Sequence, residues 1–139
     1  MKKWIPAAVL LLIPLLAALW FFIGSSPGCY ELRQSAGEID RIELVTAEDS
    51  RQFTVVKTLS DAERADFLMQ FLQLPFHTYL IGDPMSVHGN AVRIVYRNGD
   101  YEMICHHWAE YVTGDKMYFV RKNCGNTDFD HLWNRFASK

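Results

Sequence analysis

The distribution of apolar and charged residues divides the chain into two unequal parts. Residues 4–24 carry no charged side chain and directly follow Met1-Lys2-Lys3. A helix of this length covers about 30 Å, which matches the hydrocarbon thickness of a bilayer. Because the positive-inside rule keeps a short lysine-bearing end in the cytoplasm, the pattern predicts a single-pass span through residues 4–24, with the C-terminal domain outside the cell.

The short segment after the span decides whether the anchor stays attached. Gly24-Ser25-Ser26-Pro27-Gly28 is typical of a flexible tether, so residues 1–28 are expected to form an uncleaved membrane anchor. Two alternatives stay open. The small residues Ser26 and Gly28 suit cleavage before Cys29, which would give a secreted domain, and Cys29 is also a candidate lipidation site that would give a lipid-anchored one.

A hairpin and a helix are expected in the first half of the folded part. Residues Ile39–Thr46 and Gln52–Thr58 are rich in β-forming side chains and flank a polar turn, which predicts a hairpin. Ser60 and Glu63 have the spacing of a capping box. They predict the start of an amphipathic helix, which Pro75 would end.

The second half predicts four further strands. A short one is expected at residues 76–81. Asn98-Gly99 is the preferred two-residue turn of a type I′ hairpin, and it predicts that residues 91–97 pair with one long strand over residues 100–112, with Ile94 opposite Met103. A second turn at Gly114-Asp115 leads into a strand over residues 116–124, with Ala109 opposite Val120.

A second helix completes the pattern. Residues 128–138 repeat apolar side chains at positions i, i+3, i+4 and i+7, which is typical of an amphipathic helix. After the N-terminal helix, the expected order is therefore ββ-α-ββββ-α. Two amphipathic helices packed on one antiparallel sheet of five to six strands make a single α+β domain over residues 29–139. A β-barrel capped by helices is the alternative.

Four segments of the folded part form a wider pattern. They are the strand Ile39–Val45, the helix Asp61–Leu74, the hairpin Tyr96-Arg97-Asn98-Gly99 and the closing Phe129-x-x-Leu132. This pattern covers most of the domain and resembles a broad group of uncharacterised, N-terminally anchored extracytoplasmic proteins of Gram-positive bacteria. The resemblance implies an anchor followed by an α+β domain. It implies no known activity, so it assigns no functional residue.

Composition narrows the classes of function. The 139 residues are 50% hydrophobic and 14% aromatic, which is typical of a folded domain. The formal net charge is -2, and two of the lysines belong to the N-terminal anchor, so the domain itself is more acidic. Proteins that neutralise nucleic-acid phosphates usually carry a basic excess, so nucleic-acid binding is not expected.

The three cysteines suggest one disulfide. With a turn at Gly114-Asp115, Cys105 and Cys124 are expected to lie directly opposite each other on antiparallel strands. Opposed Cβ atoms are then close enough for a disulfide, and an extracytoplasmic location permits its oxidation. Two buried free thiols are the alternative. One such pair leaves Cys29 unpaired, next to the membrane.

A metal site is another use of the same residues. Cys105, His107 and Cys124 are expected to share one face of the hairpin, and imidazole and thiolate are good ligands for zinc or copper. The spacing matches no closed zinc module, however, and His88 is distant in the sequence. A bulge near His106–Trp108 would also change which histidine joins the cysteines. The sequence therefore favours ordinary strand histidines, and no cofactor is expected.

The acid–base pairs in this sequence do not indicate a catalytic site. Asp83 and His88 share a loop, and Asp128 and His131 stand near a helix start, where an aspartate more often stabilises the helix N-terminus. No Gly-x-Ser-x-Gly, phosphate-binding glycine loop or His-Glu-x-x-His motif occurs. An enzymatic function is not expected, and no catalytic residue is assigned.

The main functional prediction concerns the two faces of the sheet. One face should meet the helices, and no further helix is left to cover the other. Apolar side chains interleaved with arginine are expected on that uncovered face, among them Ile104, Trp108, Met117, Phe119 and Arg121. Such surfaces are typical of interaction sites. The alternative is a sheet that curls and buries this face as a barrel interior.

The sequence thus predicts a membrane-tethered extracytoplasmic domain that binds a protein, a peptide or another envelope component. The alternative is an extracytoplasmic metal-binding or thiol-redox protein that uses Cys105, His107 and Cys124.

Overall fold

The computed structural model of the protein describes residues 14, 16, 27–78, 86–120, 122–124 and 126–139. The predicted span at residues 4–24 lies outside the described residues, apart from residues 14 and 16. Within the described ranges, no helix is both long and apolar enough to cross a membrane.

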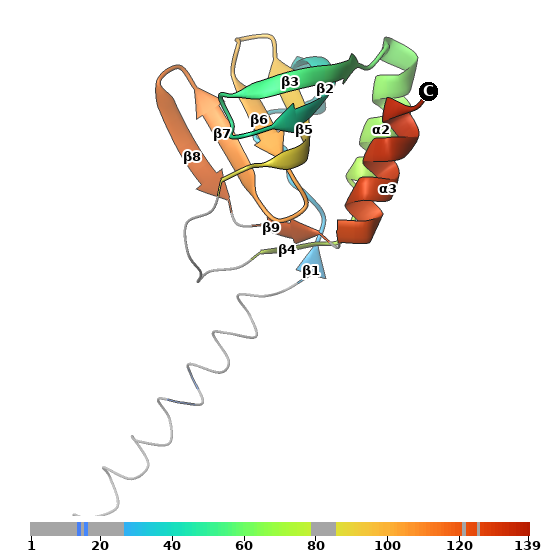
Figure 1. Ribbon diagram of the computed structural model, residues 1–139. Helices are drawn as coiled ribbons and strands as arrows, with labels where there is room; N and C mark the ends of the chain where they lie inside the picture. The colour runs from blue at the N-terminus through green and yellow to red at the C-terminus, as the bar shows by residue number, and fades with distance from the viewer. Residues whose placement is uncertain (1–13, 15, 17–26, 79–85, 121, 125) are drawn as a thin grey trace, which may run out of the picture.

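The described residues have an α+β fold, in which two helices pack beside antiparallel sheet (Figure 1). The main sheet has six strands in the order β3-β2-β5-β6-β7-β8. Its strands are β2 (Ile39–Ala47), β3 (Phe53–Thr58), β5 (Gly89–Tyr96), β6 (Tyr101–Ile104), β7 (Ala109–Thr113) and β8 (Lys116–Val120). A three-stranded sheet contains β1 (Pro27–Gly28), β4 (Phe76–Thr78) and β9 (Lys122–Cys124), in the order β1-β4-β9. The prediction of an α+β domain with an antiparallel sheet and two helices is confirmed.

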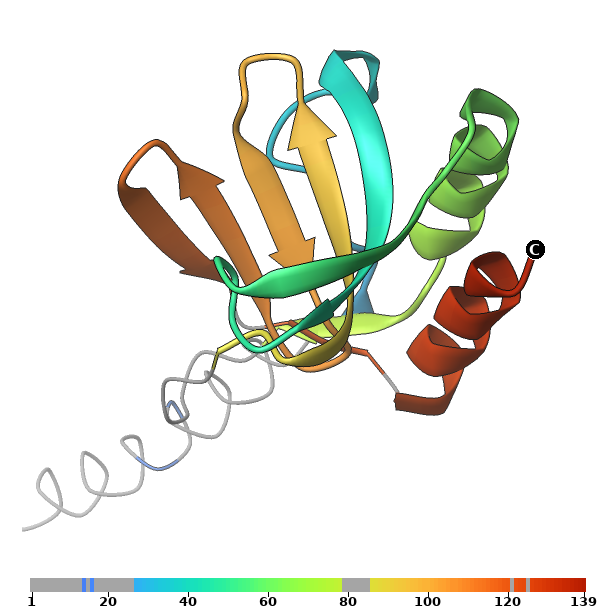
Figure 2. The same ribbon diagram turned by 45° about the horizontal axis from the view of Figure 1, so that its top comes forward.

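The helices α2 (Asp61–Phe71) and α3 (Asn126–Ala137) lie side by side along one face of the main sheet, in both views of the ribbon (Figures 1 and 2). The predicted capping box opens α2: the Ser60 hydroxyl accepts from the Glu63 N–H, and the Glu63 carboxylate accepts from the Ser60 N–H. A T-shaped contact joins the Phe67 and Phe136 rings at 5.2 Å between centroids. Aromatic packing between the two helices thus forms the centre of the main core.

The predicted turn at Asn98-Gly99 is present, but its length and the strand register differ from the prediction. Tyr96 N–H donates to the Asp100 carbonyl at 2.8 Å, and Gly99 has a φ of 88°, so the loop has three residues rather than two. Ile94 therefore lies opposite Glu102, not Met103. Since side chains alternate along a strand, this shift moves Glu102 and Ile104 to the helix face and Met103 to the opposite face.

The predicted long strand over residues 100–112 is two strands. The chain turns at Cys105–Trp108, where the Cys105 N–H donates to the Trp108 carbonyl at 2.9 Å, and β6 pairs with β7 from Ile104↔Ala109 onwards. The next hairpin keeps the predicted register, with Ala109 opposite Val120. After β8, the chain leaves the main sheet, and Cys124 on β9 pairs with Phe76 on β4.

The main sheet is strongly curled, so its second face is also enclosed. Figure 2 shows β3 crossing in front of the sheet. The turn between β2 and β3 contacts β6 and the turn between β7 and β8. The Tyr101 hydroxyl donates to the Ser50 carbonyl at 3.0 Å, and the Arg51 guanidinium donates to the Asp115 carbonyl at 3.1 Å. A second buried cluster fills this concave face and contains Val45, Ala47, Val87, Ala91, Met103, Cys105 and Trp108.

Candidate functional site

The surface predicted to bind a partner is not an exposed face in the structure. Ile104 has no exposed area and Trp108 is only 4% exposed. The prediction of exposure is wrong for both residues: the register shift turns Ile104 towards the helices, and the curled sheet encloses Trp108. Met117 is half-buried, and its sulfur lies 3.6 Å from the Ser50 hydroxyl. Two further predicted residues give no test, because the Phe119 side chain and Arg121 lie outside the described residues.

The predicted disulfide is absent, because Cys105 is a free, fully buried thiol in the turn between β6 and β7. That turn removes the cross-strand neighbourhood on which the prediction rested. Cys124 lies on β9 of the smaller sheet, opposite Phe76 in the ladder. Cys29 follows β1 and is exposed and free, so its lipidation stays a prediction.

The turn that separates Cys105 from Cys124 instead gathers histidines around the buried thiol. Cys105 Sγ lies 3.4 Å from His107 Nδ1 and 3.9 Å from His107 Nε2. The His107 ring contacts the His88 ring at 4.6 Å and the His106 ring at 4.4 Å between centroids. We call Cys105, His88, His106 and His107 the imidazole–thiol cluster.

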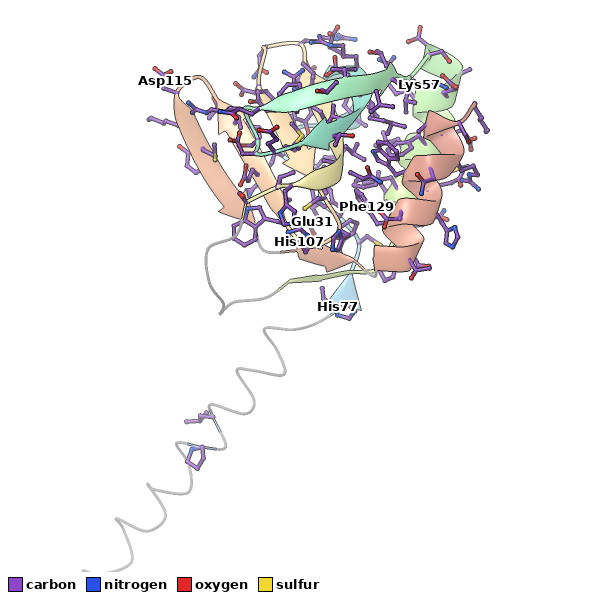
Figure 3. The ribbon with its side chains drawn as sticks, in the orientation of Figure 1. Glu31, Lys57, His77, His107, Asp115 and Phe129 are labelled. Carbon is purple, nitrogen blue, oxygen red and sulfur yellow. The ribbon has the colours of Figure 1, made fainter. Side chains whose placement is uncertain are left out.

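Local chain geometry explains how these residues meet. His88 immediately precedes β5, and the turn at Cys105–Trp108 follows β6, the neighbour of β5 in the sheet. A strand would direct His106 and His107 to opposite faces, whereas the turn lets both rings lie together. Figure 3 places His107 and His77 at the end of the domain that holds β1, β4 and β9.

Burial sets the protonation of the cluster. Desolvation, together with the positive charges that His106 and His88 would carry, lowers the pKa of His107. Burial raises the pKa of the Cys105 thiol. The arrangement at neutral pH is therefore a neutral imidazole against a protonated thiol. Among the side chains that the structure describes, no three or more histidine, cysteine, aspartate or glutamate residues are placed so that they could hold a metal ion.

A second candidate site is a groove of about 580 Å³ between the two helices. Its lining residues are Gln70, Gln73, Leu74, Asp128, His131, Leu132 and Arg135. The three charged or titratable residues of α3 are spaced at i, i+3 and i+7, which places them on one side of the helix. Asp128 and His131, a pair noted in the sequence, thus lie beside the same groove. Sequence patterns did not indicate the groove, because it depends on how α2 packs against α3.

The predicted Asp83–His88 pair cannot be placed, since Asp83 lies outside the described residues, while His88 belongs to the imidazole–thiol cluster. The geometry therefore offers two separate candidate sites. One is the imidazole–thiol cluster at the turn between β6 and β7, and the other is the groove between α2 and α3. No protein-family model matches the chain, and the searches found neither a similar curated protein nor a similar solved structure.

Proposed function

We propose that the chain is a membrane-tethered extracytoplasmic binding domain, and that the groove between α2 and α3 binds a peptide segment of another envelope protein. The uncharged residues 4–24 behind two lysines support the tether and the location. The groove is the observation that carries the binding function, because the concave face of the sheet is already filled by the protein's own side chains.

The lining of the groove suits a polypeptide. Gln70 of α2 and Gln73, just after the end of α2, carry amide donors and acceptors that can pair with the main-chain amides of a bound segment. Leu132 contributes apolar surface. Asp128 and Arg135 are seven residues apart on α3, so opposite charges stand about 10 Å from each other along the groove. Apolar surface with a few placed polar groups is typical of binding sites.

Site-specific photo-crosslinking in intact cells tests the binding surface. A photoreactive amino acid is placed at Gln73 or His131 of the full-length chain, with Met69 as the matched control. Met69 lies on α2 and is 60% exposed but does not line the groove. We expect one discrete adduct from both groove positions, none from Met69, and its loss when Arg135→Glu reverses a groove charge. Equal adducts from Met69, or none from the groove, would reject the proposal.

A thiol-labelling experiment tests the location separately. Cys29 is exposed, so a membrane-impermeant maleimide should modify it in intact cells, and Cys29→Ser should remove that signal. Labelling that occurs only after lysis would mean that the domain faces the cytoplasm. Labelling under neither condition would point to a modified Cys29, which mass spectrometry of the chain would identify as a lipid or a disulfide.

A further inference from the structure

The groove between α2 and α3 lies at the end of the domain where the folded chain begins. Its α2 side is formed by Gln70, Gln73 and Leu74, around the C-terminal end of that helix, and its α3 side begins at Asp128 in the first turn. Figures 1 and 2 show these helix ends next to β1, β4 and β9. The groove therefore opens beside the small sheet that receives the N-terminal segment.

This position identifies the kind of protein that the groove can reach. We infer that the bound segment is the first stretch of polypeptide outside the bilayer in another membrane-anchored protein, an inference that rests on the proposed span through residues 4–24 and on peptide binding by the groove. It adds the class of partner and the part of the partner that is bound, and it excludes a freely diffusing protein.

Chain connectivity limits the distance between the groove and the membrane. Gly24 ends the uncharged stretch and Gly28 follows four residues later, so at most about 14 Å separate their Cα atoms. Gly28 pairs with Phe76 across β1 and β4, at about 5 Å between Cα atoms. Leu74 of the groove precedes Phe76 by two residues, which is at most about 7 Å. Leu74 therefore lies within roughly 27 Å of the end of the span, whatever the tilt of the domain.

The α3 side of the groove is held at the same end. β9 pairs with β4 through Phe76↔Cys124, and α3 begins at Asn126, two residues after β9. The segment that follows β1 also packs against α2, because the buried Tyr30 ring contacts the Phe71 ring at 5.5 Å between centroids. The small sheet and Tyr30 thus join the membrane-side segment to the groove-lining ends of both helices.

The limited reach and the lining of the groove favour a partner in the same bilayer. An extended segment needs about eight residues to cover roughly 27 Å, so the groove can take the first residues that follow a partner's own span. Leu74 and Leu132 are the apolar residues of the lining, which is little apolar surface for a tight complex. Confinement of both proteins to one membrane compensates, because it raises the effective concentration of the partner at the groove.

The charges of the groove set the direction of the bound segment. Asp128 is in the first turn of α3, next to β9, and Arg135 is in the last turn. Both side chains are exposed, and neither forms an ion pair with another described residue. A segment that runs away from the bilayer would present a basic side chain to Asp128 and, about three residues later, an acidic one to Arg135. Residues 25–32 of this chain contain no basic residue, so a second copy does not fit.

Photo-crosslinking with altered tethers tests the inference. The full-length chain carries the photoreactive residue at Gln73, and a helical spacer of about 20 residues, roughly 30 Å long, is inserted between Ser25 and Ser26. A Gly-Ser spacer with the same number of residues is the matched control, because it lets the domain return to the membrane surface. We expect the helical spacer to lower the adduct yield by about tenfold or more, and the flexible spacer to lower it much less. Equal melting temperatures check that both variants fold.

Mass spectrometry of the adduct identifies the bound segment. We expect a contact within about eight residues of a span of the partner, with a basic residue nearer the span than an acidic one. An adduct with a soluble protein or a second copy, a contact far from a span, the reverse order of charges, or a yield unaffected by the helical spacer would overturn the inference and leave peptide binding by the groove intact. No adduct from Gln73 in the unmodified chain would reject the groove as a binding site, and the inference with it.

Discussion

Two buried glutamates on adjacent strands have opposite environments. Glu102 on β6 faces the helices, has no exposed area, and accepts hydrogen bonds from the Tyr30 and Tyr96 hydroxyls and, at 2.7 Å, from the Arg33 N–H. Glu110 on β7 faces the concave side and is 2% exposed. Its Oε1 accepts from Trp108 Nε1 at 3.1 Å, while Oε2 has no hydrogen-bond partner among the described residues.

The two faces of the sheet therefore differ in how completely their buried carboxylates are hydrogen-bonded. On the helix face, the Glu102 carboxylate ties the segment that follows β1 into the core, and the Tyr30 ring packs against Phe71 and Phe76 at 5.5 and 5.4 Å. Burial, reinforced by the Glu102 charge, raises the pKa of Tyr30 and keeps its hydroxyl a donor. The concave face is enclosed but less completely paired, and the imidazole–thiol cluster lies at its margin.

The largest expected effect tests whether the concave face is core at all. Trp108→Ala should destabilise the protein by about 3–5 kcal/mol, because it removes a buried aromatic side chain and leaves a cavity. Phe136→Ala, at a buried position of the helix face, should cost a similar amount. Urea unfolding of the full-length chain in detergent, followed by circular dichroism, measures both. A loss below about 1 kcal/mol for Trp108→Ala would mean that this face is open to solvent, as the sequence first suggested.

A smaller effect should distinguish the two glutamates directly. In Glu102→Gln an amide NH₂ replaces one acceptor oxygen, so a tyrosine hydroxyl or the Arg33 N–H loses its partner, at a cost of about 2 kcal/mol. Glu110→Gln should change the free energy of unfolding by less than about 1 kcal/mol, since Oε2 has no described partner to lose. The same urea titration compares the two variants. Equal losses would show that the contrast in hydrogen bonding has no energetic consequence.

Local signals in the sequence predicted the parts of the fold that depend on neighbouring residues. The capping box at Ser60 and Glu63 and the register around the Gly114-Asp115 turn are both present, because each is determined within a few residues. The Asn98-Gly99 turn was located correctly, but its three-residue loop shifted the register by one position. That single shift exchanged the faces of Glu102 and Met103, since side chains alternate along a strand.

The candidate sites depend on features that the sequence does not mark. The turn at Cys105–Trp108 contains none of the glycine, proline, asparagine or aspartate residues that usually signal a turn, so those residues fit a strand pattern equally well. The contacts of Ser50 with β6 and of Arg51 with the turn between β7 and β8, which enclose the concave face, are long-range tertiary interactions. The approach of His88 to His107 requires both the turn and the sheet order, so neither alone could predict it.

A third variant tests how the helix layer is held on the sheet. Lys57 of β3 donates to Glu63 Oε1 of α2 at 2.7 Å and to the Phe136 carbonyl of α3 at 3.1 Å, at the end of the helices seen near Lys57 in Figure 3. Lys57→Met should lower the free energy of unfolding by about 1 kcal/mol, because the ion pair is only partly buried. Lys116→Met, at an exposed residue of β8, is the control and should have no effect. A neutral Lys57→Met would show that aromatic packing alone positions the helices.

The smallest expected effect is confined to acid and concerns Glu43, on the concave side. Burial alone would raise the pKa of Glu43, but hydrogen bonds from Arg41 and Arg93 at 2.8 and 2.7 Å outweigh it, and the pKa is lowered. A carboxylate whose pKa is lower in the folded state stabilises the fold above its unfolded pKa of about 4.3 and loses that contribution as the pH falls through the folded value. The melting temperature of the unmodified chain should therefore exceed that of Glu43→Gln at pH 6, and the gap should narrow towards pH 3. Glu48→Gln, at an exposed residue with no ion pair among the described residues, should show no such narrowing. A difference in melting temperature that stays constant from pH 6 to pH 3 would mean that Glu43 stabilises the concave face by packing rather than by its charge.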